Sequence, residues 1–306
     1  MYFYNARWYD SYPALLDATL KTIFGEQNHM DIKHRISINS KKDAEFMSAI
    51  IKLNIDHKAS ELPGGSSQLI TFVIAESDPN WAIISELVAT KGAANMVETI
   101  FTNEEIRNAS WLRLKSTFEQ GYPQPKLHWP IKQLSYDIIC PKCAIYRQTH
   151  PMRLAKEPSL GKKSFMSTIW AAEIFCSPEV VPGLESIQAR GYEVWHALIH
   201  KTGKPSERVN QLFVSGIASP GVIIDDNLER KICPVCGTTK YYPYVKGPMR
   251  LKRESLLPDT DFMLTYEWFG HGLLAWREIL VSNRVASLIL DRGWQGVRFK
   301  VVDLVE

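Results

Sequence analysis

The chain has 306 residues, of which 45% are hydrophobic and 23% charged, and its formal net charge at pH 7 is +3. This composition is typical of a globular protein with two or three domains, and it excludes a low-complexity or fibrous chain. The small net charge argues against binding to nucleic acid or to an anionic membrane by electrostatics alone.

Residues 1–29 are an aromatic-rich leader that is predicted to contain one short helix. Apolar residues recur at helical spacing from Leu16 to Phe24, and Gly25 ends the pattern. Met30 stands directly before the first strand pattern. We therefore interpret the leader as an extension of a domain that starts at residue 30.

Residues 30–103 alternate between strand and helix periodicities. The expected elements, in chain order, are a strand over 32–38, a helix over 40–53, a strand over 55–62, a strand over 69–75, a helix over 78–92 and a strand over 96–101. This β-α-β-β-α-β order predicts a ferredoxin-like domain in a protein of the α+β class. Many unrelated functions use that fold, so it does not indicate an activity.

Residues 104–135 are predicted to be a connector between this domain and the second half of the chain. A charged helical turn is expected over 103–115. The sequence Gly-Tyr-Pro-Gln-Pro at 121–125 is unfavourable for either regular structure.

Four of the five cysteines form two C-P-x-C turns, Cys140 with Cys143 and Cys233 with Cys236. Two such turns supply the tetrahedral set of thiolates that binds Zn²⁺ at about 2.3 Å per sulfur. Four sulfur ligands leave no open position, so this zinc would be structural and would not activate water. The alternatives are two unrelated turns or a redox pair. Thiolate ligands fit a reducing compartment, and we expect a cytoplasmic protein.

The two cysteine turns are followed by similar segments. Residues 151–157 read Pro-Met-Arg-Leu-Ala-Lys-Glu, and residues 248–254 read Pro-Met-Arg-Leu-Lys-Arg-Glu. Each is followed by a Phe-Met pair, an apolar run ending in serine, an apolar helix and a strand. We interpret residues 136–306 as an internally duplicated zinc domain, with repeats of about 136–204 and 229–306 that each give half the ligands.

Other reactive residues have simpler structural interpretations. Cys176 lies in an apolar strand pattern and is expected to be a small buried hydrophobe. His196 and His200 have a spacing that serves a metal on a helix, but they are expected on a strand and no H-E-x-x-H pattern occurs. The basic cluster over 250–253 is interpreted as the solvated face of a strand. Because no catalytic constellation is found, we do not predict an enzyme.

A glycine-flanked aromatic loop around His271 suits either a contact surface or buried packing. If it is a contact surface, the residues predicted to meet a partner are Trp268, Phe269, His271 and Trp276.

The cysteine turns and the tail Trp-Phe-Gly at 268–270, Ile-Leu-Val-Ser at 279–282 and Gly-Trp-Gln-Gly at 293–296 resemble the double-CxxCG proteins of bacteria. The resemblance covers about residues 136–306. Gly237 follows the second turn as the family motif requires, whereas Ala144 stands where the motif implies glycine. The resemblance implies a zinc-holding scaffold, and some members are immunity proteins of polymorphic or contact-dependent toxin systems.

We therefore predict a zinc-stabilised binding protein of the immunity type that occludes a cognate toxin. The alternative is a zinc-ribbon protein that binds nucleic acid or has a regulatory role, although the near-neutral net charge argues against this alternative. An enzyme that uses groups of the aromatic loop would require a pocket around His271. A membrane partner is not expected, because no stretch approaches roughly 20 apolar residues, and the oligomeric state stays open.

Overall fold

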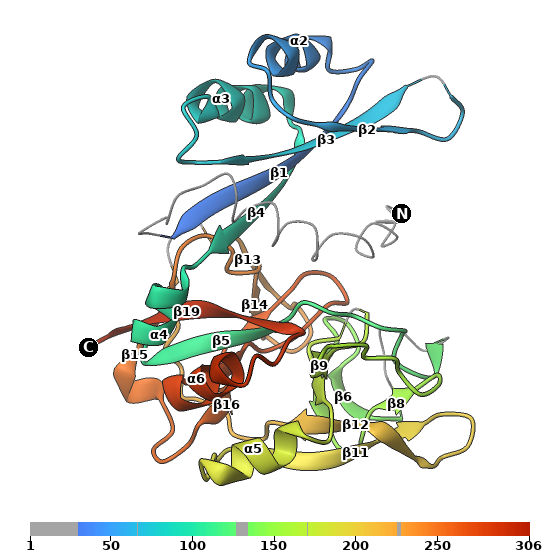
Figure 1. Cartoon of the computed structure of the whole chain (residues 1–306), viewed down its shortest axis with the longest axis vertical. Coiled ribbons are helices and arrows are strands. Elements are labelled where there is room, and N and C mark those ends of the chain that lie inside the picture. The colour runs from blue at the N-terminus through green and yellow to red at the C-terminus, as the bar shows by residue number, and fades with distance from the viewer. Residues whose placement is uncertain (1–29, 66, 127–133, 170, 225–227) are drawn as a thin grey trace.

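The computed structural model describes residues 30–306 apart from 66, 127–133, 170 and 225–227 (Figure 1). The helix predicted within residues 1–29 lies outside the described residues. The described chain is a mixed α+β protein with many strands and few helices, as the sequence predicted. No helix in this part of the chain combines the length and the apolar character that crossing a membrane requires.

The N-terminal unit is a four-stranded sheet with the order β2-β3-β1-β4, in which all neighbours are antiparallel. Its elements are β1 (Asp31–Asn39), α2 (Ala44–Lys52), β2 (Lys58–Glu61), β3 (Gln68–Ala75), α3 (Trp81–Lys91) and β4 (Ala94–Ile100). Both helices lie on the side of the sheet that faces away from the rest of the molecule (Figure 1). The period-2 pattern of β1 places Ile36 and Ile38 in the core, where they meet Phe46 of α2 and Ile84 of α3.

Helix α2 begins later than the sequence predicted. The Asn39 side chain accepts hydrogen bonds from the amides of Lys41 and Lys42, and the Asp43 carboxylate accepts one from the amide of Asn39. These local bonds hold a turn before the helix, so its first helical residue is Ala44 and not a neighbour of Ser40.

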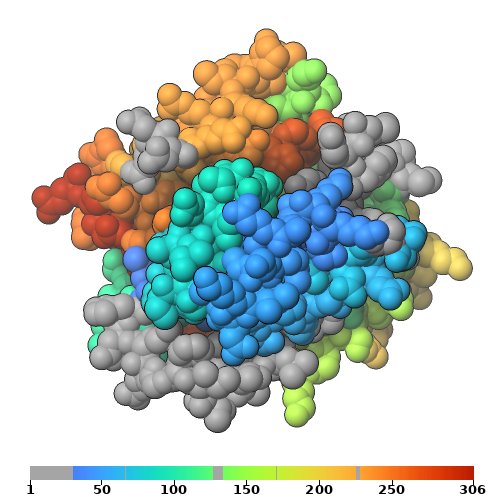
Figure 2. Space-filling view, turned by 90° about the horizontal axis from the view of Figure 1, so that it is seen from above, coloured from blue at the N-terminus to red at the C-terminus, as the bar shows by residue number. Residues whose placement is uncertain are grey.

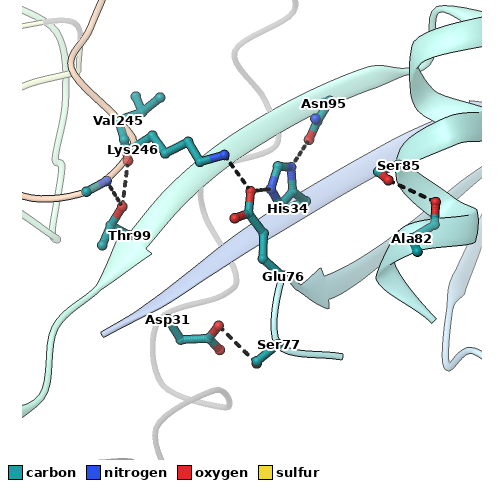
Figure 3. Close-up of polar contacts among 11 residues, drawn as sticks. Asp31, His34, Glu76, Ser77, Ala82, Ser85, Asn95, Thr99, Val245 and Lys246 are labelled. Carbon is teal, nitrogen blue, oxygen red and sulfur yellow. Dashed lines mark hydrogen bonds and ion pairs between the residues drawn. The ribbon is translucent and has the colours of Figure 1, made fainter. Parts of the chain in front are cut away.

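The N-terminal unit is attached to the second half by a loop that Figure 3 shows against the end of β4. Thr99 Oγ1 donates a hydrogen bond of 2.9 Å to the carbonyl of Val245 and accepts one of 2.8 Å from the amide of Gly247. Between them, the Lys246 ammonium lies 2.9 Å from the Glu76 carboxylate. The loop is therefore held by both its backbone and its side chain.

Part of the expected connector is a sheet strand. Helix α4 (Asn103–Asn108) carries a capping box and ends early, and β5 (Trp111–Ser116) follows. The helical turn predicted through residue 115 is wrong, because Leu112 and Leu114 alternate with charged residues and are 0% and 3% exposed. In Figure 1, β5 lies beside the C-terminal strand β19.

Two five-stranded sheets make up most of the second half, with the orders β8-β11-β12-β10-β9 and β15-β19-β5-β18-β16. The elements of the first are β8 (Arg153–Leu154), β9 (Phe165–Met166), β10 (Ile174–Cys176), α5 (Val180–Ser186), β11 (Glu193–Ile199) and β12 (Pro205–Phe213). Those of the second, besides β5, are β15 (Met249–Lys252), β16 (Phe262–Leu264), β18 (Ile279–Ser282), α6 (Asn283–Asp291) and β19 (Val297–Val305).

The two sheets agree in strand order, in strand direction and in register. The matched cross-strand pairs are Phe175–Met166 with Leu280–Met263, Ile174–Leu212 with Ile279–Leu114, Val194–Leu212 with Phe299–Leu114, and Leu198–Arg153 with Asp303–Arg250. Only the origin of the central strand differs. β12 follows β11 through a hairpin, whereas β5 comes from a segment that precedes the whole first sheet.

The two sheets also hold each other by reciprocal contacts. The amide of Phe262 donates to the carbonyl of Arg190 at 3.0 Å, and the amide of Phe165 donates to the carbonyl of Gln295 at 2.9 Å. The next residue in each case is a glycine with positive φ, and a Cβ there would lie 2.2 Å or less from the opposing phenylalanine carbonyl. Each half therefore needs glycine where the other half's backbone approaches.

Two small sheets carry the cysteine turns. One pairs β6 (Tyr136–Cys140) with β7 (Ile145–Gln148), and the other has the order β13 (Arg230–Ile232), β14 (Thr239–Tyr241) and β17 (Trp268–Phe269).

Candidate metal centre

Each C-x-x-C turn closes a β-hairpin in the same way. In the first turn the amide of Ala144 donates a 2.8 Å hydrogen bond to the carbonyl of Cys140, and in the second the amide of Gly237 donates one of 2.9 Å to Cys233. The residue after the second cysteine has positive φ in both turns, 58° for Ala144 and 72° for Gly237. The two turns therefore present their sulfurs with matching backbone geometry.

Ala144, after the first turn, adopts the same left-handed conformation as Gly237 after the second. Ala144 is 3% exposed and sits in the left-handed region, which places its Cβ close to its own carbonyl. The substitution therefore leaves the ligand geometry intact, and its cost is a local backbone strain.

The structure brings the four predicted cysteines together. Their sulfur atoms all lie within 4.8 Å of one another, with Cys140 and Cys233 3.9 Å apart and Cys143 and Cys236 3.6 Å apart. A tetrahedron of sulfurs around zinc has edges of about 3.8 Å, because each Zn–S bond is about 2.3 Å long. The cluster could therefore hold a metal ion without movement of either hairpin.

Hydrogen bonds from the second turn favour the thiolate form of its cysteines. The hydroxyl and the amide of Thr238 lower the pKa of Cys236 to about 6. The amides of Cys236 and Val235 lower the pKa of Cys233. Donors that point at sulfur are the usual outer contacts of a thiolate that binds metal.

Lys240 ties the cluster to the neighbouring loop. The residue is 4% exposed, and its ammonium group donates to three backbone carbonyls, those of Cys143 at 2.8 Å, Gly272 at 2.6 Å and Leu274 at 2.9 Å. All three donors are thus used, and a positive charge lies beside the cluster. Sequence reasoning missed this residue, because a single lysine in a three-residue strand gives no signal.

The aromatic residues predicted as partner contacts are mostly packed. Phe269 is 0% exposed in a core cluster, so we do not propose it as a contact. Trp276 is half-buried and donates to the Glu278 carboxylate at 3.0 Å. Trp268 is half-buried against the cysteine cluster. His271 alone among the four is exposed.

The remaining candidates agree with their structural interpretations, except that His200 lies outside the strand on which it was expected. Cys176 is fully buried, and burial raises the pKa of its thiol. His196 is exposed on β11 and bonds Asn210, whereas His200 lies in the turn after that strand. Among the described residues, the cysteine cluster is the one group of three or more metal-ligating side chains that was found.

Apolar side chains are exposed around the cysteine turns. We call these residues the knuckle surface: Ile139, Ile232, Val235 and Leu273, which are 60%, 66%, 69% and 46% exposed. Exposed Lys142, Arg230 and Lys231 border them, and Cys236 is exposed beside them. In Figure 2 the orange segment that contains the second turn protrudes at the edge of the molecule.

A scan against protein-family models and a search of curated proteins found no match to this chain. The resemblance to the double-CxxCG proteins therefore depends on the residues quoted above.

Proposed function

We propose that the chain is a zinc-stabilised scaffold that binds another protein, as an immunity-type protein of a toxin system does. The observation that carries the metal part is the tetrahedral spacing of four cysteine sulfurs contributed by two hairpins. Soft thiolates in this arrangement favour zinc, and the closed ligand set suits a structural ion.

The matched sheets support an internal duplication in which each copy supplies one cysteine turn. The cross-strand registers agree in four strand pairings. The backbone hydrogen bonds that the two copies form with each other after α5 and α6 are also equivalent. The strand order of the N-terminal unit likewise supports a ferredoxin-like domain. Under this proposal zinc joins the two copies, and the N-terminal unit is an added domain.

The partner-binding part of the proposal is supported by the knuckle surface. A group of large apolar side chains exposed beside a rigid metal centre is typical of a protein–protein contact. The cations at its border favour a partner with an acidic surface. Occlusion of a toxin needs a rigid complementary surface and no catalytic group, which fits a structural ion.

The metal is tested by elemental analysis of the purified chain. We expect one zinc per chain in the wild type and none in the Cys233→Ser, Cys236→Ser double variant. A wild-type chain that is fully folded without metal would contradict the proposal.

The partner is tested by co-expression with a toxin encoded by a neighbouring gene and by capture of that toxin. We expect Ile232→Asp and Val235→Asp to abolish protection and capture. Ile51→Asp is the matched control, because Ile51 is 67% exposed but lies on α2, far from the cysteines. An equal loss in the control would contradict the assignment of binding to the knuckle surface. Salt-sensitive binding to an oligonucleotide, with no toxin bound, would overturn the proposal in favour of the nucleic-acid-binding alternative.

A further inference from the structure

Four cations face one another on a single face of the second five-stranded sheet. In the register of β5 and β19, Arg113 lies opposite Lys300 and Lys115 lies opposite Arg298. Like charges directly opposite each other on antiparallel strands destabilise a sheet unless something compensates them. We call these four residues the cation quartet.

The described carboxylates compensate only half of this charge. Glu278, the residue directly before β18, lies 2.5 Å from Lys115 and 3.9 Å from Arg113. Glu98, from β4 of the N-terminal unit, lies 3.4 Å from Lys300 and pairs with Arg298. Four positive charges less two negative charges leave an excess of two.

Arg113 has donors that nothing among the described residues satisfies. Its side chain is 1% exposed, and its Nη1 donates to the carbonyl of Tyr244 at 2.9 Å. Its Nε and Nη2 have no hydrogen-bond partner in the described part of the chain. Buried donors without a partner are rare in native proteins, and each one requires an explanation.

The fold itself does not require the quartet, because the first sheet has none. The positions that match the quartet in register are Glu193, Trp195, Gln211 and Phe213. There, Trp195 stacks on Phe213 with ring centroids 3.7 Å apart, and Gln211 bonds both Gln148 and the amide of Met152. The same backbone is thus stable with an aromatic pair and a satisfied amide.

The quartet is open to solvent at one end and closed at the other. The side chains of Arg298 and Lys115 are 46% and 30% exposed, whereas those of Lys300 and Arg113 are 9% and 1% exposed. Burial lowers the pKa of Lys115 and lowers that of Lys300 to about 8, and the neighbouring cations lower both further.

We propose that the cation quartet binds a small oxyanion of the phosphate class, which enters between Arg298 and Lys115. A phosphate dianion carries the charge that the site lacks, and guanidinium and ammonium groups are the side chains that hold phosphate oxygens. Glu98 competes with the anion for Arg298 and Lys300. Because Glu98 belongs to the N-terminal unit, occupancy of the site weakens one contact between that unit and the second sheet. The proposal does not depend on the toxin-binding function.

The test is titration of the zinc-loaded full chain with inorganic phosphate and with pyrophosphate at constant ionic strength, followed by calorimetry and ³¹P NMR. We expect Arg298→Gln to weaken binding by about tenfold or more, because one charge-assisted contact is lost. Glu98→Gln is expected to tighten it, because the competing carboxylate is removed. Arg250→Gln, an exposed cation on β15 of the same sheet, is expected to leave it unchanged.

These variants distinguish a site from general attraction. Arg298→Lys keeps the charge and is expected to restore part of the affinity, with melting curves confirming that each variant is folded. The proposal is overturned if phosphate does not bind at millimolar concentration, if Arg250→Gln and Arg298→Gln weaken binding equally, or if only an oligonucleotide binds.

Discussion

The two five-stranded sheets share one backbone geometry but differ in the side chains at their matched central positions. In the first sheet the central strand β12 is joined to its neighbour β11 by a hairpin, and Gln211 of β12 forms a neutral amide pair with Gln148. In the second sheet the central strand β5 arrives from far upstream, and the matching residue Arg113 is part of a buried ionic cluster with Glu278. Backbone pairing therefore fixes the shape of each sheet, while the side chains are free to differ. The first sheet has a central strand from a neighbouring hairpin and a neutral amide pair. The second has a central strand from a distant segment of the chain and a buried ionic cluster.

The largest effect should follow removal of the strand on which only the second sheet depends. A fragment of residues 136–306 lacks β5, so β18 and β19 lose their common neighbour and become two exposed edges. We expect this fragment to aggregate or to remain unfolded. A fragment of residues 103–306 keeps β5 and is expected to fold, as judged by gel filtration and by amide NMR dispersion.

If the shorter fragment folded with native amide NMR dispersion, the second sheet would not need β5, and the stated difference between the two sheets would be contradicted. Failure of both fragments would instead mean that the N-terminal unit is required through the contacts of Glu98 and Lys246.

The next largest effect should follow loss of the metal that joins the two halves. In the Cys233→Ser, Cys236→Ser variant the chain loses an apparent binding energy of about 10–16 kcal/mol, which exceeds the net stability of most domains. We expect a collapse of the melting temperature and rapid proteolysis between the two halves. Cys176→Val is the control, because Val281 fills the position that matches Cys176 in the other sheet.

The two sheets should differ in their response to mutation. Glu278→Gln leaves the buried Arg113 and the partly exposed Lys115 without their shared carboxylate and is expected to cost about 3–5 kcal/mol in the free energy of unfolding. Gln211→Leu leaves the amide of Met152 without its acceptor and is expected to cost about 1–3 kcal/mol. Urea denaturation of both variants measures the difference, and equal costs would remove the distinction between the sheets.

The same ionic cluster should make stability depend on pH. Burial opposes ionisation of Glu278, but Lys115 and Arg113 outweigh it and lower the pKa from its ordinary value of 4.5 to about 2. Its contribution, about 3 kcal/mol, is therefore complete above pH 4.5 and is lost as the pH falls toward 2. Urea midpoints across this range should fall steeply in the wild type and less steeply in Glu278→Gln.

The smallest effect concerns the two cysteine turns. Ala144→Gly is expected to stabilise the protein by about 1 kcal/mol or less, because glycine adopts the left-handed conformation without strain. Gly237→Ala is expected to destabilise it by a similar amount. A small shift of opposite sign in the two melting temperatures would confirm that the turns are equivalent, and shifts of the same sign would contradict it.

Much of the local structure could be predicted from the sequence. The alternation of Ile36 and Ile38 with polar residues gave β1, and the apolar run at 279–282 gave β18, because period-2 burial is visible in single residues. β5 was missed, because its two leucines lie in a segment with three cations and two acidic residues, a pattern typical of a solvated helix. Only its pairing with a strand near the C-terminus reveals that those charges are buried, and pairing partners are not visible in a local pattern.

The metal centre was predictable and its surroundings were not. Two C-x-x-C turns have few other uses, so Cys140 and Cys233 could be assigned to one cluster despite their separation in the chain. Lys240, the knuckle surface and the cation quartet depend on how separate hairpins and strands meet. The aromatic loop shows the same limit, because its composition suits a surface and a core equally, and packing placed Phe269 in the core.

The path of β5 has a consequence for biosynthesis. At elongation rates of 5–20 residues per second, roughly 10–40 s separate the emergence of β5 from the ribosome and that of β19, its last partner. The N-terminal unit has all its strands when β5 emerges, and the first sheet gains its last strand, β12, during this interval, while Leu112 and Leu114 remain on an unpaired strand. The nascent chain therefore offers a chaperone one apolar target of known position, and slower translation would prolong its exposure.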